Sequence, residues 1–249
     1  MSWLHWIIYT VIILVFLLTL VMGFILIERR VVGRFQLRLG PNRVGPQGIL
    51  QPVADAIKIL LKEDITPAKG DRIVHLLAPI VAFAPAVLVF AVIPFQQAGK
   101  GLFFSLQAPA VMADLNVGIL YIFAISSVSV VGLVMAGCAS NNKYSLLGAM
   151  RTIAQMVSYE IPMVISVLGI VIIAGSLSLA DIVDKQNIPF ILLQPLGFFI
   201  YFLGATAEMN RSPFDLLEAD SEIVAGVNIE YSGMKFAMFF LGEYAYALA

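Results

Sequence analysis

Apolar runs separated by shorter polar segments dominate the chain and limit what it can fold into. The first run, residues 3–27, holds about 25 residues, which as a helix would measure roughly 37 Å at 1.5 Å per residue. The hydrocarbon core of a bilayer is roughly 30 Å thick, so this run can cross it with some tilt. Further spans are expected at residues 73–95, 117–137, 153–175, 189–207 and 233–249. The sequence therefore predicts an all-α, polytopic bundle of about six transmembrane helices in a single membrane domain.

Composition agrees with a membrane protein and excludes several other classes. Hydrophobic residues make up 60% of the chain and charged residues 12%, which is too few charges for the surface of a soluble domain. The net charge of −1 provides no basic field for binding nucleic acid. The single cysteine, Cys138, excludes a disulfide framework, a thiolate zinc site and an iron–sulfur cluster held by this chain alone. We therefore expect no metal site here and any redox cofactor in another protein of the same assembly.

The distribution of basic residues predicts the orientation in the membrane. The loops after the first, third and fifth spans, with their flanks, hold 13 of the 15 Lys and Arg residues, and the opposite side holds only Lys100 and Lys185. Loops on the cytoplasmic or matrix side carry such an excess. The asymmetry places the N-terminus on the outer, periplasmic or intermembrane, side. The inner loops are then expected at residues 28–72, 138–152 and 208–232.

The first inner loop is long and has the pattern of a structured segment. Glycine and proline residues between positions 40 and 48 predict turns. After them, apolar residues recur at helical spacing, namely Ile49, Val53, Ile57, Leu60 and Leu61. This pattern predicts an amphipathic helix lying at the membrane surface. A helix packed against neighbouring spans would give the same pattern, and periodicity does not separate the two.

One glutamate, Glu160, lies inside the fourth predicted span. A charged side chain in the middle of a membrane helix costs about 2.5–3.5 kcal/mol on insertion scales. The face of its own helix is apolar, so a polar partner has to come from another helix or from water. Pro162 removes one backbone donor, so we expect a kink or a water-lined cavity nearby. This placement favours proton or ion handling over a purely structural hydrogen bond.

The segment from Ala207 to Tyr231 gathers six of the 16 acidic residues of the chain, which are Glu208, Asp215, Glu218, Asp220, Glu222 and Glu230. Three of them, Asp215, Glu218 and Glu222, fall on one face if the segment is helical, where like charges repel. Such a group of carboxylates suits the sharing of protons better than mere solvation. Glu208 has Arg211 three residues later, so an interfacial ion pair is the alternative there. Glu243 is a second acid inside a predicted span.

Three stretches of the sequence resemble a known family. They read ERRVVGRFQLRLGPNRVGPQGILQPVADAIKILLKE from position 28, SNNKYSLLGAMRTIAQMVSYEIP from position 140, and AEMNRSPFDLLEADSEIVAGVNIEYSGMKFAMFFLGEY from position 207. These are similar to the NuoH family, a membrane component of respiratory complex I, the proton-translocating NADH:quinone oxidoreductase. Members of the family have about eight spans, so the resemblance implies a C-terminally truncated member.

The resemblance implies that quinone, either ubiquinone or menaquinone, enters from the bilayer through a passage in this protein and is reduced near its inner end. It also implies that partner subunits bind NADH, FMN and the iron–sulfur clusters. Expected partners are the soluble quinone-site subunits, small membrane subunits and the lipid bilayer of a bacterial or mitochondrial inner membrane. By itself the chain is expected to be inactive.

The resemblance also assigns residues. Those matching the quinone passage are Glu28, Arg29, Gln36, Arg38, Arg43, Asp55 and Phe214. Those matching the carboxylates that couple quinone reduction to proton movement are Glu160, Glu208, Glu243, Asp215, Glu218, Asp220 and Glu222.

Other functions fit part of the pattern. The equivalent component of a membrane-bound hydrogenase or formate hydrogenlyase is the nearest alternative. A stand-alone ion transporter would explain the spans and the buried acids, but it would leave the long structured inner loop without a reason. A passive membrane anchor for soluble partners is a third interpretation.

Overall fold

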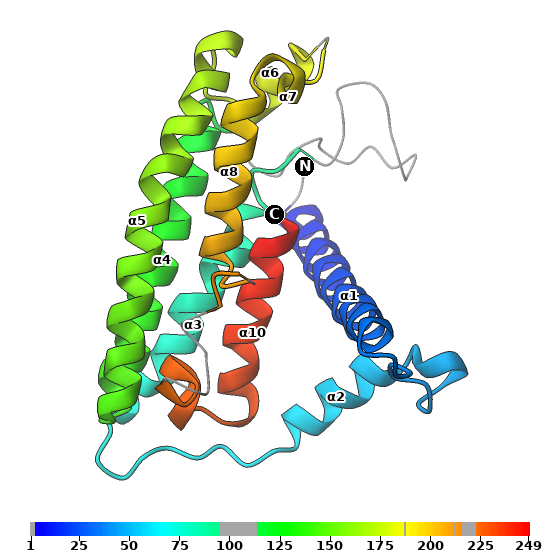
Figure 1. Cartoon of the computed structure of the whole chain (residues 1–249), viewed down its shortest axis with the longest axis vertical. Helices are drawn as coiled ribbons and strands as arrows, with labels where there is room; N and C mark the ends of the chain where they lie inside the picture. The colour runs from blue at the N-terminus through cyan, green and yellow to red at the C-terminus, as the bar shows by residue number, and fades with distance from the viewer. Residues whose placement is uncertain (1–2, 95–113, 187, 212, 216–222) are drawn as a thin grey trace. The chain divides into compact units, whose positions relative to one another are not determined.

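The computed structural model describes residues 3–94, 114–186, 188–211, 213–215 and 223–249. Every regular element in these residues is helical, with nine α-helices and two short 3-10 turns (Figure 1). The chain divides into two compact units, and each is described here by itself. The first unit combines Met1–Ile65 with Tyr231–Leu248, and the second unit is Thr66–Glu230. The expected all-α fold class is thereby confirmed.

The first unit joins the two ends of the described sequence. It contains α1 (Trp3–Phe35), α2 (Gln51–Leu60) and α10 (Gly233–Leu248), and these three helices contact one another pairwise. A 3-10 turn, η1 (Pro46–Gly48), lies in the segment between α1 and α2. The apolar face predicted for α2 stays exposed within this unit, including Leu60 and other large residues. Such exposure is what a helix at a membrane surface requires.

The second unit is a row of antiparallel helices. Its long members are α3 (Arg72–Val89), α4 (Gly118–Ala139), α5 (Lys143–Ala174) and α8 (Pro195–Glu208), and its short ones are α6 (Leu179–Asp184), α7 (Phe190–Leu193) and the 3-10 turn η2 (Gly226–Glu230). Helix α4 packs against α3 and α5, and α5 packs against α8 (Figure 1).

Small residues set the distance between α3 and α4. A methyl group added at Gly132 of α4 would lie 2.5 Å from the backbone nitrogen of Ala82 on α3. The buried positions of α3 include Ala78, Ala82 and Ala86, and those of α4 include Ser129. Lipid tails are as apolar as leucine side chains, so membrane helices gain little by burying large apolar groups and pack instead through close contact of small ones.

Four described helices are long and apolar enough to cross a membrane, over Thr10–Phe35, Arg72–Val89, Gly118–Ala139 and Lys143–Ala174. They correspond to the first four predicted spans. Helix α5 starts ten residues earlier than the predicted span at 153, because Asn142 caps it by accepting a hydrogen bond from the backbone N–H of Tyr144 at 3.0 Å. Helices α8 and α10, with 14 and 16 residues, are shorter, so the fifth and sixth spans remain predictions.

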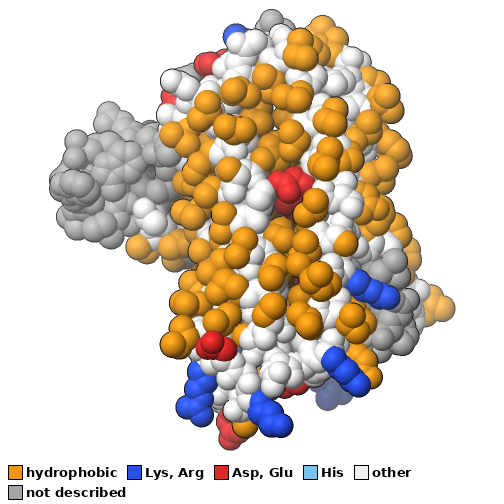
Figure 2. Space-filling model, turned by 90° about the vertical axis from the view of Figure 1, so that its left-hand side faces the viewer, with side chains coloured by type: hydrophobic (Ala, Val, Ile, Leu, Met, Phe, Trp, Pro, Cys, Tyr) orange, Lys and Arg blue, Asp and Glu red, His pale blue; other side chains and the backbone are white. Residues whose placement is uncertain are grey.

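The face of the second unit over α5 is mostly apolar (Figure 2). Hydrophobic side chains cover most of its height, an acidic group is visible amid them, and Lys and Arg side chains gather at one end. A surface of this kind suits contact with lipid, since a soluble monomer rarely exposes so large an apolar patch.

Segments from all three predicted inner loops meet at that end of the second unit. A methyl group at Gly70 would lie 2.5 Å from the carbonyl oxygen of Ala139. The Asn142 amide donates a hydrogen bond to Glu230 at 2.9 Å, which joins the start of α5 to η2. Lys185, predicted to lie on the outer side, donates to the carbonyl of Ala174 at the far end of α5. The arrangement within this unit therefore agrees with the distribution of charge along the sequence.

Candidate functional site

The second unit contains a polar cluster built from three helices. The Ser127 hydroxyl of α4 donates a hydrogen bond to Glu160 near the middle of α5. Its neighbour Ser126 hydrogen-bonds Glu208, the last residue of α8. The charge of Glu160 acts on Glu208, so the two carboxyl groups lie within electrostatic reach of each other. Successive serines of α4 thus hold one acid from α5 and one from α8.

The sequence left two sources for the polar partner of Glu160, another helix or water, and in the structure Ser127 of α4 is a partner. The two serines were not predicted from the sequence, although a signal for them existed. Ser126, Ser127 and Ser129 lie in a predicted span that is otherwise almost wholly apolar, and polar groups in such a span usually serve a neighbouring helix. Helix α5 continues through Pro162 from Lys143 to Ala174.

The arrangement of this cluster has a chemical consequence. Two ionised carboxylates close together repel each other in a medium of low dielectric, and a proton held on either one removes the repulsion. Tyr201, seven residues before Glu208 on α8, is also within reach of the Glu208 charge. A cluster with these properties can take up, hold and release a proton.

The chain after α8 is anchored to α5. The Gln155 side-chain amide donates hydrogen bonds to the carbonyl oxygens of Ala207 at 2.9 Å and Phe214 at 3.2 Å. The ring of Phe214 packs edge-to-face on Tyr159, with ring centroids 5.2 Å apart. Asp215, which follows, is exposed. The other predicted acids of this segment lie outside the described residues, namely Glu218, Asp220 and Glu222.

In the first unit, Asp55 joins α2 to α1. The carboxylate accepts a hydrogen bond from Arg29 of α1 and two more, each at 3.3 Å, from Gln51 and Lys58 of α2. Partial burial acts to raise the pKa of Asp55, but these hydrogen bonds and the charge of Arg29 outweigh it and hold the pKa below its ordinary value. Two residues predicted to line the quinone passage, Arg29 and Asp55, are thus brought together.

The remaining predicted residues of the first unit fall into two places. Glu28 accepts a hydrogen bond at 2.6 Å from the hydroxyl of Tyr244 on α10, next to the half-buried Glu243. Arg38 donates to the side chain of Gln36 at 2.7 Å in the segment after α1.

Arg43 is exposed in the same segment. Phe214 belongs to the second unit, together with the Glu160 and Glu208 cluster. Among the residues that the structure describes, no group of three or more His, Cys, Asp or Glu side chains is placed to hold a metal ion.

Comparison with known proteins decides the family. The sequence pattern of the family described as NADH dehydrogenase matches residues 8–249. The NuoH protein of NADH-quinone oxidoreductase from Dehalococcoides mccartyi (strain CBDB1) is 60% identical over 247 residues, which are 99% of this chain and 67% of that protein. The chain belongs to the NuoH family. The NuoH protein of Brevibacillus brevis is 52% identical over 237 residues, or 93% of this chain and 67% of the relative.

Membership of the NuoH family confirms the resemblance seen in the three sequence stretches, and with it the expectation that the chain is a subunit of this oxidoreductase. The chain spans about two thirds of the length of the relatives it matches. A third relative, the NuoH protein of Geobacillus thermodenitrificans, is 52% identical over 239 residues, 94% of this chain and 69% of the relative. Similarity across nearly the whole chain covers both units and hence all the described residues discussed above.

Proposed function

We propose that the chain forms part of the quinone site of a proton-translocating NADH:quinone oxidoreductase and links quinone reduction to proton movement. In this proposal the segment around Glu28, Arg29, Gln36, Arg38, Arg43 and Asp55 lines the passage jointly with soluble partner subunits. Family membership supports it, since the relatives are named for quinone reduction. The apolar outer face of the second unit supports a location in an energy-transducing membrane.

The observation that carries the coupling role is the pair of acids Glu160 and Glu208. They come from different helices, lie within electrostatic reach of each other, and are held by adjacent serines of a third helix. Reduction of a quinone consumes two protons and changes the local charge. Two carboxyl groups within electrostatic reach of each other can respond to such a change in charge, and we propose that they pass it on as movement of a proton.

Glu243, Asp215, Glu218, Asp220 and Glu222 are proposed to extend this set of coupled acids. The N-terminus is proposed to lie on the outer side, with residues 28–72, 138–152 and 208–232 on the inner side. The fifth and sixth spans, at 189–207 and 233–249, complete the proposed membrane domain. NADH, FMN and the iron–sulfur clusters belong to partner subunits in this proposal.

Replacement of each intramembrane acid by its amide tests the coupling role. Glu160→Gln, Glu208→Gln and Glu243→Gln remove a proton site and leave the side-chain shape nearly unchanged. In the assembled complex we expect proton translocation per NADH oxidised to fall several-fold in at least the Glu160 and Glu208 variants. The measurements are proton uptake into inverted membrane vesicles and NADH:quinone turnover in the same preparation.

Glu63→Gln is the matched control, because Glu63 is an exposed acid between α2 and α3 that belongs to neither predicted set. Its pumping and turnover should match the wild type. Undiminished pumping and turnover in all three intramembrane variants would contradict the proposal. Copurification with a nickel–iron hydrogenase instead of NADH-oxidising flavin subunits would favour the hydrogenase alternative.

A further inference from the structure

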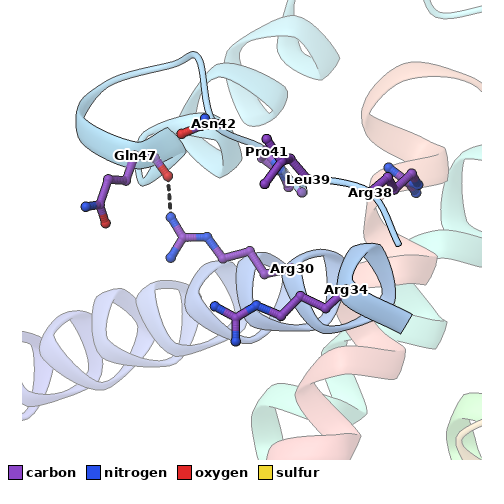
Figure 3. Close-up of a pocket in the computed structure, with 8 residues that line it drawn as sticks. Arg30, Arg34, Arg38, Leu39, Pro41, Asn42 and Gln47 are labelled. Carbon is purple, nitrogen blue, oxygen red and sulfur yellow. Dashed lines mark hydrogen bonds between the residues drawn. The ribbon is translucent and has the colours of Figure 1, made fainter. Parts of the chain in front are cut away.

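Two adjacent arginines near the C-terminal end of α1 hold two different elements of the first unit. Arg29 bonds Asp55 of α2, and Arg30 donates an N–H to the main-chain carbonyl oxygen of Gln47 in η1 (Figure 3). Successive residues of a helix point about 100° apart, so neighbouring side chains can reach separate partners. The family resemblance assigns Arg29 to the quinone passage and gives Arg30 no role.

The segment between α1 and η1 folds back along the helix that it leaves. Its first turn is closed by backbone hydrogen bonds, such as the one from the N–H of Arg38 to the carbonyl oxygen of Gly33 at 2.9 Å. A methyl group at Gly40 would lie 3.0 Å from the Cα of Arg30, so glycine lets the returning chain approach the helix closely. Arg30 is half-buried against this segment. The same segment carries the passage residues Gln36, Arg38 and Arg43.

The turn that Arg30 holds is strained. Gln47 has a φ of 54° and a ψ of 26°, in the left-handed region that residues other than glycine disfavour. Gly48 follows with a φ of 76°, and a methyl group there would lie 2.2 Å from the carbonyl oxygen of Pro41. A strained residue persists only where surrounding contacts outweigh its cost, and such residues gather at active sites and ligand clamps. The hydrogen bond from Arg30 is a contact of this kind.

Arg34, one turn further along α1, lacks this contact. Both arginines line an open pocket of about 330 Å³ together with Arg38, but the three side chains point apart (Figure 3). Within the described part of the chain, the Arg34 side chain makes no hydrogen bond and no ion pair. Arg30 and Arg34 thus place similar charge at this end of α1, whereas only Arg30 of the two is bonded to η1.

We propose that Arg30 is a positioning residue for quinone binding, an inference that rests on the proposed assignment of the passage. Its guanidinium holds the turn at Gln47 and thereby the segment that carries Arg38. Without this bond the turn relaxes toward a right-handed conformation, and the segment shifts relative to α1. The bond affects where passage residues lie and takes no part in the chemistry. Its loss therefore weakens quinone binding more than it slows reduction of the bound quinone.

Quinone kinetics in the assembled complex test this role. For Arg30→Gln we expect the KM for a short-chain quinone to rise about fivefold, the effect of one typical hydrogen bond, while kcat stays within about twofold of the wild type. Arg30→Lys keeps a charged donor and should recover most of the lost affinity. Arg34→Gln is the matched control, because it removes the same charge from the same end of α1, and its KM should be unchanged. Blue-native electrophoresis shows that each variant is assembled.

Amide hydrogen exchange in the same complex tests the bond without quinone. The N–H groups of Gly48, Ile49 and Leu50 donate to carbonyl oxygens of their own segment, and their protection should fall about fivefold in Arg30→Gln. The amides of α2 should keep their protection, because Arg29 still bonds Asp55. Gln47→Ala should match the wild type in protection and in KM, since the acceptor is the main-chain carbonyl oxygen and remains.

Arg38→Gln separates this inference from the proposed function. Arg38 belongs to the proposed passage, so its loss should raise the KM for quinone. An unchanged KM in Arg38→Gln would reject the passage and the role of Arg30 with it. A raised KM in Arg38→Gln beside a wild-type KM in Arg30→Gln would reject the role of Arg30 alone. An equal rise in Arg34→Gln would also overturn it, because charge rather than the bond to η1 would then set the KM.

Discussion

At the scale of single residues, the described contacts pair ionisable groups with specific polar partners. Glu160 is hydrogen-bonded to Ser127, Glu208 to Ser126, and Asp55 to Arg29. Each partner comes from a different helix, so each pair also joins two helices. Glu160 and Glu208 lie among apolar helices, where water replaces a lost partner poorly, so these two pairs are sensitive to conservative substitution. The Arg29 side chain is half exposed, so water can replace it more readily.

The first prediction concerns Ser127→Ala. The variant deprives Glu160 of its donor from α4 and should destabilise the packed helices by about 1 kcal/mol. Infrared difference spectra recorded on quinone reduction should show a displaced carboxyl band for this acid. Ser129→Ala is the control, because Ser129 donates to the Ser126 carbonyl of its own helix at 2.7 Å. Identical spectra for both variants would show that the Ser127 bond has no bearing on Glu160.

The second prediction concerns the pH dependence of Asp55. Its pKa is lowered in the folded chain, so its contribution to stability is fully present above the ordinary value of 3.8 and is lost as the pH falls through the lower folded value. Asp55→Asn should therefore loosen α2 near neutral pH, and the protection of the amides of Gln51–Leu60 against exchange should fall about fivefold. Protection, taken relative to the intrinsic exchange rate at the same pH, should fall to this level in wild-type α2 only in strong acid. A wild-type protection that already falls between pH 8 and pH 5 would contradict the assignment.

At the scale of helices, small residues decide which surfaces pack. Gly148 of α5 faces Gly226 of η2, where an added methyl group would lie 2.6 Å from the Gly226 Cα. Gly132 of α4 meets α3 in the same way. Backbone atoms cannot move aside as the end of a flexible side chain can, so these contacts fix the spacing of the helices.

The third prediction follows from this spacing. Gly132→Ala should force α3 and α4 apart and destabilise the second unit by about 1–3 kcal/mol, even though alanine is the better helix former. The change is measured by thermal unfolding of the purified complex, with the loss of the intact NuoH chain as the readout. Gly23→Ala is the matched control, since nothing lies within 4 Å of a methyl group at that position of α1. Equal stability of the two variants would contradict the proposal that Gly132 sets the spacing between α3 and α4.

At the scale of the whole molecule, the charge along the sequence and the contacts within the second unit agree on one orientation. The loops predicted to be on the inner side, with their flanks, carry 13 of the 15 arginines and lysines, and the start of α3, the end of α4 and the start of α5 meet at one end of that unit. An orientation of this kind requires every long helix of the unit to alternate in direction across the membrane.

The fourth prediction tests that orientation with single cysteines in a Cys138→Ser background. Lys69→Cys lies on the predicted inner side and Asp184→Cys on the outer side, and both side chains are exposed. A membrane-impermeant maleimide added to right-side-out vesicles should label only the cysteine at position 184. Inverted vesicles should give the opposite result. Labelling of position 69 from the outer side would reverse the topology.

Much of the helical content was predictable from the sequence, because hydropathy and helix-capping residues act over short distances. Four described helices that are long and apolar enough to cross a membrane overlap the first four predicted spans, and the early start of α5 reflects the Asn142 cap, which hydropathy does not report. The surface helix is shorter than the apolar pattern from 49 to 61. Gly48 has a φ of 76°, which a continuing helix does not allow, and Pro52 favours the first turn.

The sequence by itself determined that acids lie within apolar helices, since composition and order along the chain are enough to state it. Only the tertiary structure decided that Ser127, which is 33 residues from Glu160, supplies its hydrogen bond, and that Arg30, Arg34 and Arg38 line one pocket. Partners distant along the chain are chosen by the packing of helices and the turn of the backbone after α1. Hydropathy reports neither, because it averages over neighbours in sequence rather than neighbours in space.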